Sequence, residues 1–133
     1  MLRMTAQCPR YNEALQEVLQ LPEVQRELRQ TQQLFENLQN FTGMNISSAA
    51  DVTSLFITLW AEQLYGLELP EWTTGYYPQQ MEFMASQSYV YNAYTTEMRR
   101  IKGGPFLKEF LKQLNSFVAG AKERKTYLYC AHD

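Results

Sequence analysis

The sequence KTYLYCAHD occupies residues 125–133 and decides how the whole chain is interpreted. Tyr127 to Ala131 form an unbroken run of aromatic and small apolar residues, which is typical of a strand buried on both faces of a parallel sheet. The run ends at His132, the single histidine of the sequence, and Asp133 follows at once. Because ligands of open α/β sheets bind just beyond the carboxyl ends of strands, this pair stands where chemistry is expected.

A strand needs neighbouring strands, and no other segment of the sequence has a convincing strand pattern. We therefore expect the neighbours to lie outside these 133 residues, so that the chain is a piece of a larger protein.

Upstream of this segment, apolar residues recur at helical spacing and predict a mainly α-helical chain. The pattern indicates about five helices, over residues 12–19, 22–43, 48–66, 78–102 and 105–120. Ser48, with Asp51 three residues later, is a typical helix N-cap, and the wide apolar stripe after it predicts the most deeply buried helix. Gly103-Gly104 is interpreted as the end of the fourth helix.

Composition limits the class of protein. With 45% hydrophobic and 20% charged residues, the 133 residues can form one ordinary globular domain and are not expected to be disordered. The net charge of −2 provides no basic surface for nucleic acid. No apolar stretch approaches the roughly 20 residues that a membrane span requires.

Two glycosylation sequons favour a secretory route. They begin at Asn40 and Asn45, near a predicted helix end and loop. Residues 1–10 lack the apolar core of a signal peptide. The two cysteines, Cys8 and Cys130, do not by themselves settle the redox compartment.

Several kinds of site are disfavoured by residue spacing. One histidine and two distant cysteines match no zinc pattern, so no metal is expected, and no glycine-rich phosphate loop is present. Tyr89, Tyr91 and Tyr94 could stack on bases, but without interleaved basic residues they are better interpreted as core and rim.

Four short motifs, in order, resemble landmarks of the histidine acid phosphatases of the lysosomal, prostatic and testicular type. They are Cys8-Pro9-Arg10-Tyr11, Leu69-Pro70-Glu71-Trp72, Gly103-Gly104 with its following helix, and Tyr129-Cys130-Ala131-His132-Asp133. The resemblance implies an α/β catalytic domain with an inserted helical region. Residues 1–124 would be the helical insertion region, and residues 125–133 the returning core strand with the second catalytic motif.

The implied reaction is hydrolysis of phosphomonoesters through a phosphohistidine intermediate, without a metal or other cofactor. In it, His132 would bind the phosphoryl oxygens and Asp133 would protonate the leaving oxygen. The resemblance also implies a lysosomal or secreted glycoprotein, commonly a homodimer, in which Cys8 pairs with a cysteine beyond Asp133.

One departure from the family pattern concerns the nucleophile. The family's nucleophilic histidine lies in an R-H-G-x-R-x-P motif that these residues lack, so we expect the 133 residues alone to be inactive. A non-catalytic helical interaction module, or an inactive relative that keeps the fold for binding, are the alternatives that the sequence leaves open.

Overall fold

The computed structural model describes residues 8–121, 124 and 126–130, and these residues form six α-helices and one 3-10 helix. The elements are α1 (Pro9–Leu19), α2 (Pro22–Gln30), α3 (Gln32–Thr42), α4 (Ala49–Leu64), η1 (Glu71–Gly75), α5 (Gln79–Asn92) and α6 (Thr96–Val118). The prediction of a mainly α-helical chain is therefore confirmed for this part of the sequence.

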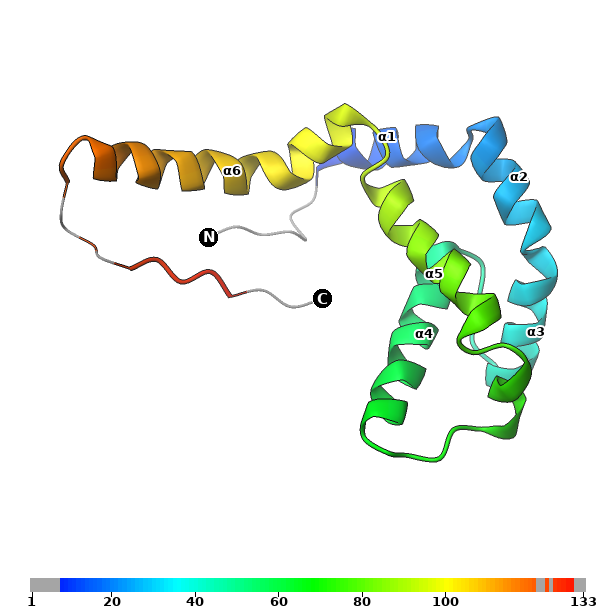
Figure 1. Ribbon diagram of the computed structural model, residues 1–133. Helices are drawn as coiled ribbons and strands as arrows, with labels where there is room; N and C mark the ends of the chain where they lie inside the picture. Colours follow the sequence, from blue (N-terminus) through cyan, green and yellow to red (C-terminus); the bar gives the residue numbers. More distant parts are fainter. Residues whose placement is uncertain (1–7, 122–123, 125, 131–133) are drawn as a thin grey trace.

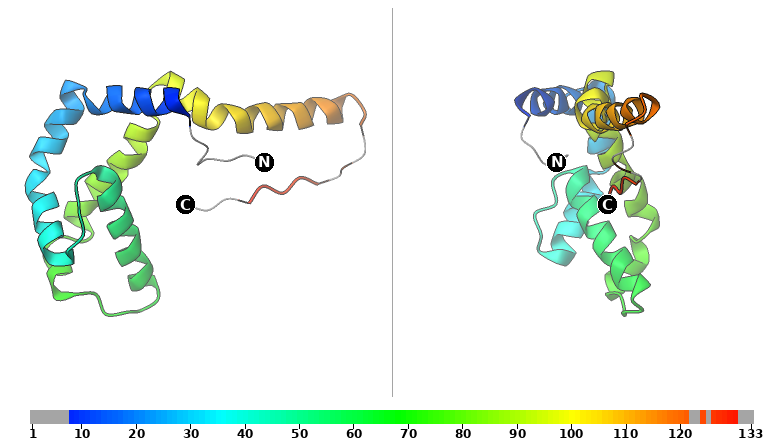
Figure 2. Two further views of the ribbon diagram at one scale, coloured as in Figure 1. Left: turned by 180° about the vertical axis from the view of Figure 1, so that it is seen from behind. Right: turned by 90° about the vertical axis from the view of Figure 1, so that its left-hand side faces the viewer.

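Two parts of the molecule differ in how they pack. Helices α1 to α5 form a body in which α4 and α5 lie side by side and α1 to α3 curve around one side (Figure 1). Helix α6 begins against α1 and then extends away from this body as a long arm (Figures 1 and 2).

The hydrophobic core lies within the body. Its most completely buried large side chains are Leu38, Met81, Met84, Met98, Val18, Val24 and Val52. Of the buried residues, only Met98 comes from α6, and it lies in the first turn of that helix. The body therefore has a core of its own, and α6 contributes to that core through Met98 in its first turn.

The predicted second helix, residues 22–43, is divided in two at Thr31, so the prediction of one continuous helix is wrong. The Thr31 hydroxyl lies 2.9 Å from the carbonyl oxygen of Glu27 and 3.2 Å from that of Leu28. Back-bonding of this kind often bends helices, and it accompanies the change of direction between α2 and α3 in Figure 1. It does not by itself end a helix, because Thr53 bonds the Ala49 carbonyl oxygen in the same way within the continuous α4. The predicted stop at Gly43 is confirmed, because that glycine adopts φ 68° in the left-handed region.

The boundary predicted at Gly103-Gly104 is also wrong, because α6 continues through both glycines and Pro105. Neither glycine has a positive φ, so neither adopts the left-handed conformation that commonly ends a helix. The chain breaks earlier, after Asn92, and α6 begins where the Thr95 hydroxyl accepts a 3.1 Å hydrogen bond from the Met98 N–H.

The predicted N-cap of the third helix is confirmed in α4. The Ser48 hydroxyl accepts from the Asp51 N–H, while the Asp51 carboxylate accepts from the Ser47 N–H at 3.0 Å. The expectation that this helix is the most deeply buried is wrong, because Trp60 and Leu64 of its apolar stripe are 46% and 67% exposed. That stripe is only half covered by the residues that the structure describes.

The predicted strand from Tyr127 to Ala131 is not formed within residues 126–130, and Ala131 lies outside the described residues. Residues 126–130 have no regular secondary structure and make no backbone hydrogen bond to any other described residue. A strand requires a partner strand to bond to, and the described part of the chain supplies none.

Candidate functional site

The predicted catalytic pair, His132 and Asp133, lies outside the residues that the structure describes. The segment that leads to it, residues 126–130, runs beside α6 (Figures 1 and 2). Its one aromatic contact is between Tyr129 and Phe106, whose ring centroids are 5.1 Å apart at an interplanar angle of 82°. Edge-to-face geometry is a favourable arrangement for two aromatic rings. The contact therefore joins residues 126–130 to α6.

Arg10, from the Cys-Pro-Arg-Tyr motif, is held by carboxylates from two helices. Its guanidinium donates two hydrogen bonds of 2.7 Å to Glu97, at the start of α6, and one of 2.8 Å to Glu17 of α1. These carboxylates raise the pKa of Arg10, and the guanidinium in turn lowers the pKa of Glu97. Arg10 therefore links α1 to α6, and most of its hydrogen-bonding capacity is already committed to carboxylates.

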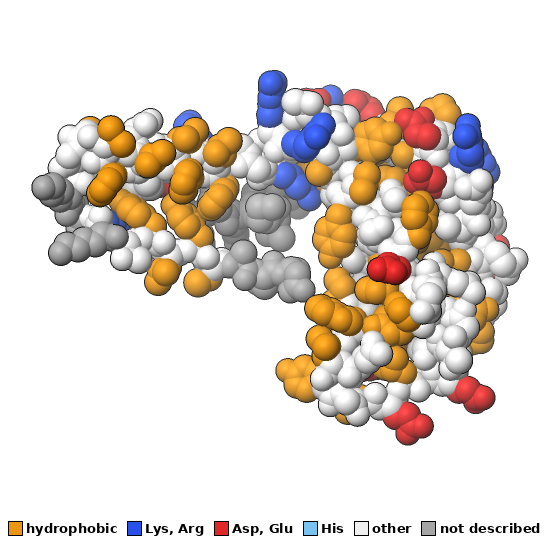
Figure 3. Space-filling model, viewed as in Figure 1, with side chains coloured by type: hydrophobic (Ala, Val, Ile, Leu, Met, Phe, Trp, Pro, Cys, Tyr) orange, Lys and Arg blue, Asp and Glu red, His pale blue; other side chains and the backbone are white. Residues whose placement is uncertain are grey.

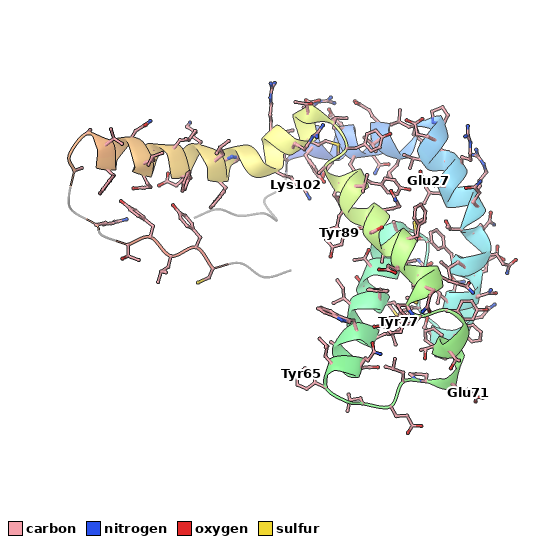
Figure 4. All side chains as sticks on the ribbon, in the orientation of Figure 1. Glu27, Tyr65, Glu71, Tyr77, Tyr89 and Lys102 are labelled. Atoms are coloured by element: carbon pink, nitrogen blue, oxygen red, sulfur yellow. The ribbon has the colours of Figure 1, made fainter. Side chains whose placement is uncertain are left out.

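Lys102 completes this junction. Its ammonium lies 4.6 Å from the centroid of the Tyr11 ring, within the range of a cation–π contact (Figure 4). The Tyr11 hydroxyl is 2.9 Å from the Asn92 carbonyl oxygen and 2.8 Å from its side-chain oxygen. The motif that carries the family resemblance near the start of the chain is thus a structural joint among α1, α5 and α6.

Two further tyrosines join α5 and the following turn to α2. Tyr91 donates to Glu27, and burial followed by this hydrogen bond raises the pKa of Tyr91. Tyr94 donates to Glu23 at 3.0 Å, and that hydrogen bond is the main reason that the pKa of Tyr94 is raised. Sequence reasoning missed both links, since partners 64 and 71 residues apart leave no local pattern.

The tyrosines that could have formed a stacking platform do not share one environment. Tyr91 is buried in the core, Tyr94 is half-buried, and Tyr89 is exposed on α5 (Figure 4). Their interpretation as core and rim is confirmed.

The remaining predicted residues lie at the surface. Asn40 is in the last turn of α3 and Asn45 is in the connection to α4, and both side chains are exposed. Cys8 is the half-buried N-cap residue of α1, Cys130 is exposed, and the two form no disulfide with each other.

Within the described ranges, no three His, Cys, Asp or Glu side chains are grouped so that they could hold a metal ion. In the same part of the chain, no helix has both the length and the apolar character that crossing a membrane would require.

Comparison with known proteins identifies relatives over nearly the whole sequence. The chain is 35% identical to the venom acid phosphatase Acph-1 of Apis mellifera over 130 residues, and 31% identical to the lysosomal acid phosphatase of Homo sapiens over 132 residues. It is 26% identical to the prostatic acid phosphatase of Rattus norvegicus over 130 residues. Each alignment covers 95% of this chain.

The chain spans about a third of the length of these relatives, the aligned shares being 33%, 30% and 34% in the same order. No solved structure matches the chain. The sequence profile described as "Histidine phosphatase superfamily (branch 2)" matches residues 1–133. The chain therefore belongs to the histidine phosphatase superfamily, branch 2.

Proposed function

We propose that these residues are part of an acid phosphatase that hydrolyses phosphomonoesters through a phosphohistidine intermediate. The observation that supports this most strongly is the family match over all 133 residues, which ends on the His132-Asp133 pair. The nucleophilic histidine would come from polypeptide outside these residues, because His132 is the only histidine here. Residues 1–124 would form the helical region of the catalytic domain, and residues 125–133 would return to its α/β core.

The proposed roles of the pair follow from the charges of the reaction. A transferring phosphoryl group spreads negative charge over its oxygens, so an imidazolium of His132 directed at them would stabilise the transition state. An alcohol leaves poorly unless it is protonated, and the carboxylic acid of Asp133 would supply that proton. An acidic compartment keeps more of this carboxyl in the protonated form.

The first experiment extends the reading frame on both sides and assays two proteins with p-nitrophenyl phosphate. We expect an upstream R-H-G-x-R-x-P motif, turnover by the longer polypeptide, and none by residues 1–133 alone. Turnover by the 133-residue chain would contradict the proposed location of the nucleophile. A folded longer polypeptide without turnover would instead indicate a family member that keeps the fold without the reaction.

The acid role of Asp133 can be separated from simple damage to the site by varying the leaving group. In the longer polypeptide, Asp133→Asn should lower kcat/KM, which reports the step in which the leaving group departs, by about a hundredfold or more on an alkyl phosphate, the usual contribution of a general acid. The loss should be smaller on p-nitrophenyl phosphate, whose phenolate leaves without a proton. Equal losses on both substrates would contradict the assignment of Asp133 as proton donor.

We also propose a secretory or lysosomal location, with glycans on Asn40 and Asn45. The exposure of both side chains is compatible with attached glycans. Expression in a eukaryotic secretory host should give a product that an endoglycosidase shifts to lower mass. Asn40→Gln and Asn45→Gln should each remove one step of that shift, and an unshifted secreted product would contradict the assignment.

Cys8 is proposed to form a disulfide with a cysteine beyond Asp133. Mass spectrometry of peptides from the unreduced longer polypeptide tests this. A Cys8 peptide linked to a segment after residue 133 is the expected result, and a free Cys8 thiol in the folded, oxidised protein would contradict it.

A further inference from the structure

A partly exposed aromatic cluster lies where the end of α3 meets η1. The Phe41 ring stacks on Trp72 with the ring centroids 5.4 Å apart, and it meets Tyr76 edge to face at 5.3 Å. Trp72 and Tyr76 are half-buried and pack against the core, whereas Phe41 is 47% exposed. The cluster therefore presents one aromatic ring at the surface on a support that is already packed.

The same end of α3 carries the first glycosylation sequon. Asn40 directly precedes Phe41 and lies one helical turn after Asn37. The Asn37 amide donates a 3.1 Å hydrogen bond to the Tyr76 hydroxyl, so this side of α3 faces the cluster. Residues three and four positions apart are neighbours on a helix, so Asn40 and Phe41 both lie next to Asn37. The exposed Asn40 side chain therefore lies beside the cluster.

The chemistry of this surface is compatible with a neutral sugar. Helix α3 has one charged residue, Glu36, and the side of α3 drawn in Figure 3 shows mostly uncharged side chains. A face of a pyranose ring carries C–H hydrogens of partial positive charge, and the face of an aromatic ring is negative, so the two faces attract each other. The Tyr76 hydroxyl accepts the bond from Asn37, so its own hydrogen stays available for a sugar oxygen.

We propose that the inner sugars of a glycan on Asn40 pack on Phe41 and its aromatic neighbours. The inference rests on the glycosylation proposed above, and it adds what the attached sugars contact. The position of the sequon supports this occupant, because attachment at Asn40 tethers the sugars one residue from the exposed ring and makes the contact intramolecular. The second sequon differs, since Asn45 is followed by Ile46, which is 3% exposed.

Hydroxyl-radical footprinting read by mass spectrometry tests the contact in the longer polypeptide, secreted from a eukaryotic host. Phe41 should oxidise severalfold more slowly in the glycosylated protein than in Asn40→Gln, because the sugars cover its ring. Asn45→Gln should leave the rate at Phe41 unchanged. Tyr65, which is 86% exposed at the end of α4, is the reference and should oxidise at the same rate in all three proteins.

Thermal stability gives a second measurement. Asn40→Gln should lower the Tm of the secreted protein, because it removes the packed sugars. Phe41→Leu keeps the sequon and an apolar side chain but removes the ring, so in its background Asn40→Gln should lower the Tm by less than half as much. Asn45→Gln should change the Tm equally with and without Phe41→Leu. Equal losses from Asn40→Gln in the two backgrounds would overturn the inference.

The outcomes separate this inference from the proposals on which it rests. A glycan on Asn40, with Phe41 oxidised at the same rate in its presence and absence, would overturn the inference and leave the glycosylation in place. An intact mass that shows no sugar on Asn40 would reject both. Neither measurement uses turnover, so protection of Phe41 by the glycan in an inactive polypeptide would uphold the inference and reject the proposed reaction.

Discussion

The body and the arm are made of similar residues but differ in what those residues contact. In the body, the unbranched side chains Met81 and Met84 are fully buried between neighbouring helices. In the arm, Leu111 and Leu114 are 44% and 46% exposed although they occupy equally regular helical positions. An apolar stripe therefore does not establish that a helix is packed; it establishes only which face will be buried when a partner is present.

The largest expected difference between the two parts is the cost of removing an apolar side chain. In the 133-residue chain, Met84→Ala should lower the free energy of unfolding by about 2–5 kcal/mol, because it leaves a cavity in the core. Leu114→Ala should change it by less than about 0.5 kcal/mol, since the side chain is half exposed. Urea denaturation followed by circular dichroism measures both, and similar losses would show that the arm is packed in solution.

The next difference concerns the hydrogen bond between Tyr91 and Glu27, which lies within the body. Tyr91→Phe should lower the free energy of unfolding by about 2 kcal/mol, because it removes a hydrogen bond to the charged Glu27 carboxylate. Tyr89→Phe is the matched control on the exposed face of the same helix and should have almost no effect. A double-mutant cycle with Glu27→Ala, which removes the acceptor, should show strong coupling to Tyr91, and additive losses would contradict a direct link.

Both α4 and α6 begin with a hydroxyl cap, but removing the cap should affect stability differently in the body and in the arm. Ser48→Ala removes the cap of α4 and should lower the stability of the whole body by about 1 kcal/mol. Thr95→Ala removes the cap of α6 and should show mainly as faster amide exchange in the first turns of the arm. Hydrogen exchange measured residue by residue distinguishes the two; a global loss from Thr95→Ala would mean that the arm and body unfold together.

The Asp51 carboxylate at the start of α4 should also make the stability of the body depend on pH. Although partial burial favours the neutral carboxyl, hydrogen bonds from Ser47 and Ser48 lower the pKa of Asp51 below its ordinary value of 3.8. A depressed carboxyl pKa contributes stability that is fully present above the ordinary value and is lost as pH falls through the folded value. Asp51→Asn should therefore narrow the difference in stability between pH 5 and pH 3, and an unchanged difference would contradict this account.

The smallest effect is expected at the joint between the two parts. Glu97 is exposed, so Arg10→Gln should change stability little. The Arg10 guanidinium lowers the pKa of Glu97 below its ordinary value of 4.5. The small contribution of this ion pair to stability should therefore be lost only as pH falls below 4.5 through the pKa of Glu97 in the folded protein. An NMR titration should show the pKa of Glu97 rising in Arg10→Gln, whereas Arg99→Gln should leave it unchanged.

Local chemistry explains which parts of the fold could be predicted. The α4 cap and the stop at Gly43 depend on groups within a few residues of each other, and sequence alone identified both. The sequence pattern misplaced the boundaries at Thr31 and at Gly103-Gly104, because α2 ends at Gln30 and α6 runs through both glycines and Pro105. A helical repeat of apolar residues indicates which face is buried, but it does not fix where a helix bends or ends.

The candidate site shows the same division. His132 and Asp133 were recognised from a short motif, and their roles stay predictions. The contacts that join α1, α2, α5 and α6 connect residues far apart in sequence, such as Arg10 with Glu97. A local sequence pattern therefore could not predict them. The strand expected before the pair depends on a partner that the described residues do not contain, so its side-chain pattern alone could not form it.

The two tryptophans lie in different environments, so their fluorescence can report on two different events. Trp72 stacks on Phe41 at a centroid distance of 5.4 Å and packs against the core, whereas Trp60 projects from α4 with nearly half its surface in water. Emission from Trp60 should shift to shorter wavelength when other protein covers it, while emission from Trp72 should report only on melting of the helical body. In Trp72→Phe, Trp60 alone would report assembly, and in Trp60→Phe, Trp72 alone would report unfolding, so two unlabelled single-tryptophan variants would give the two signals separately.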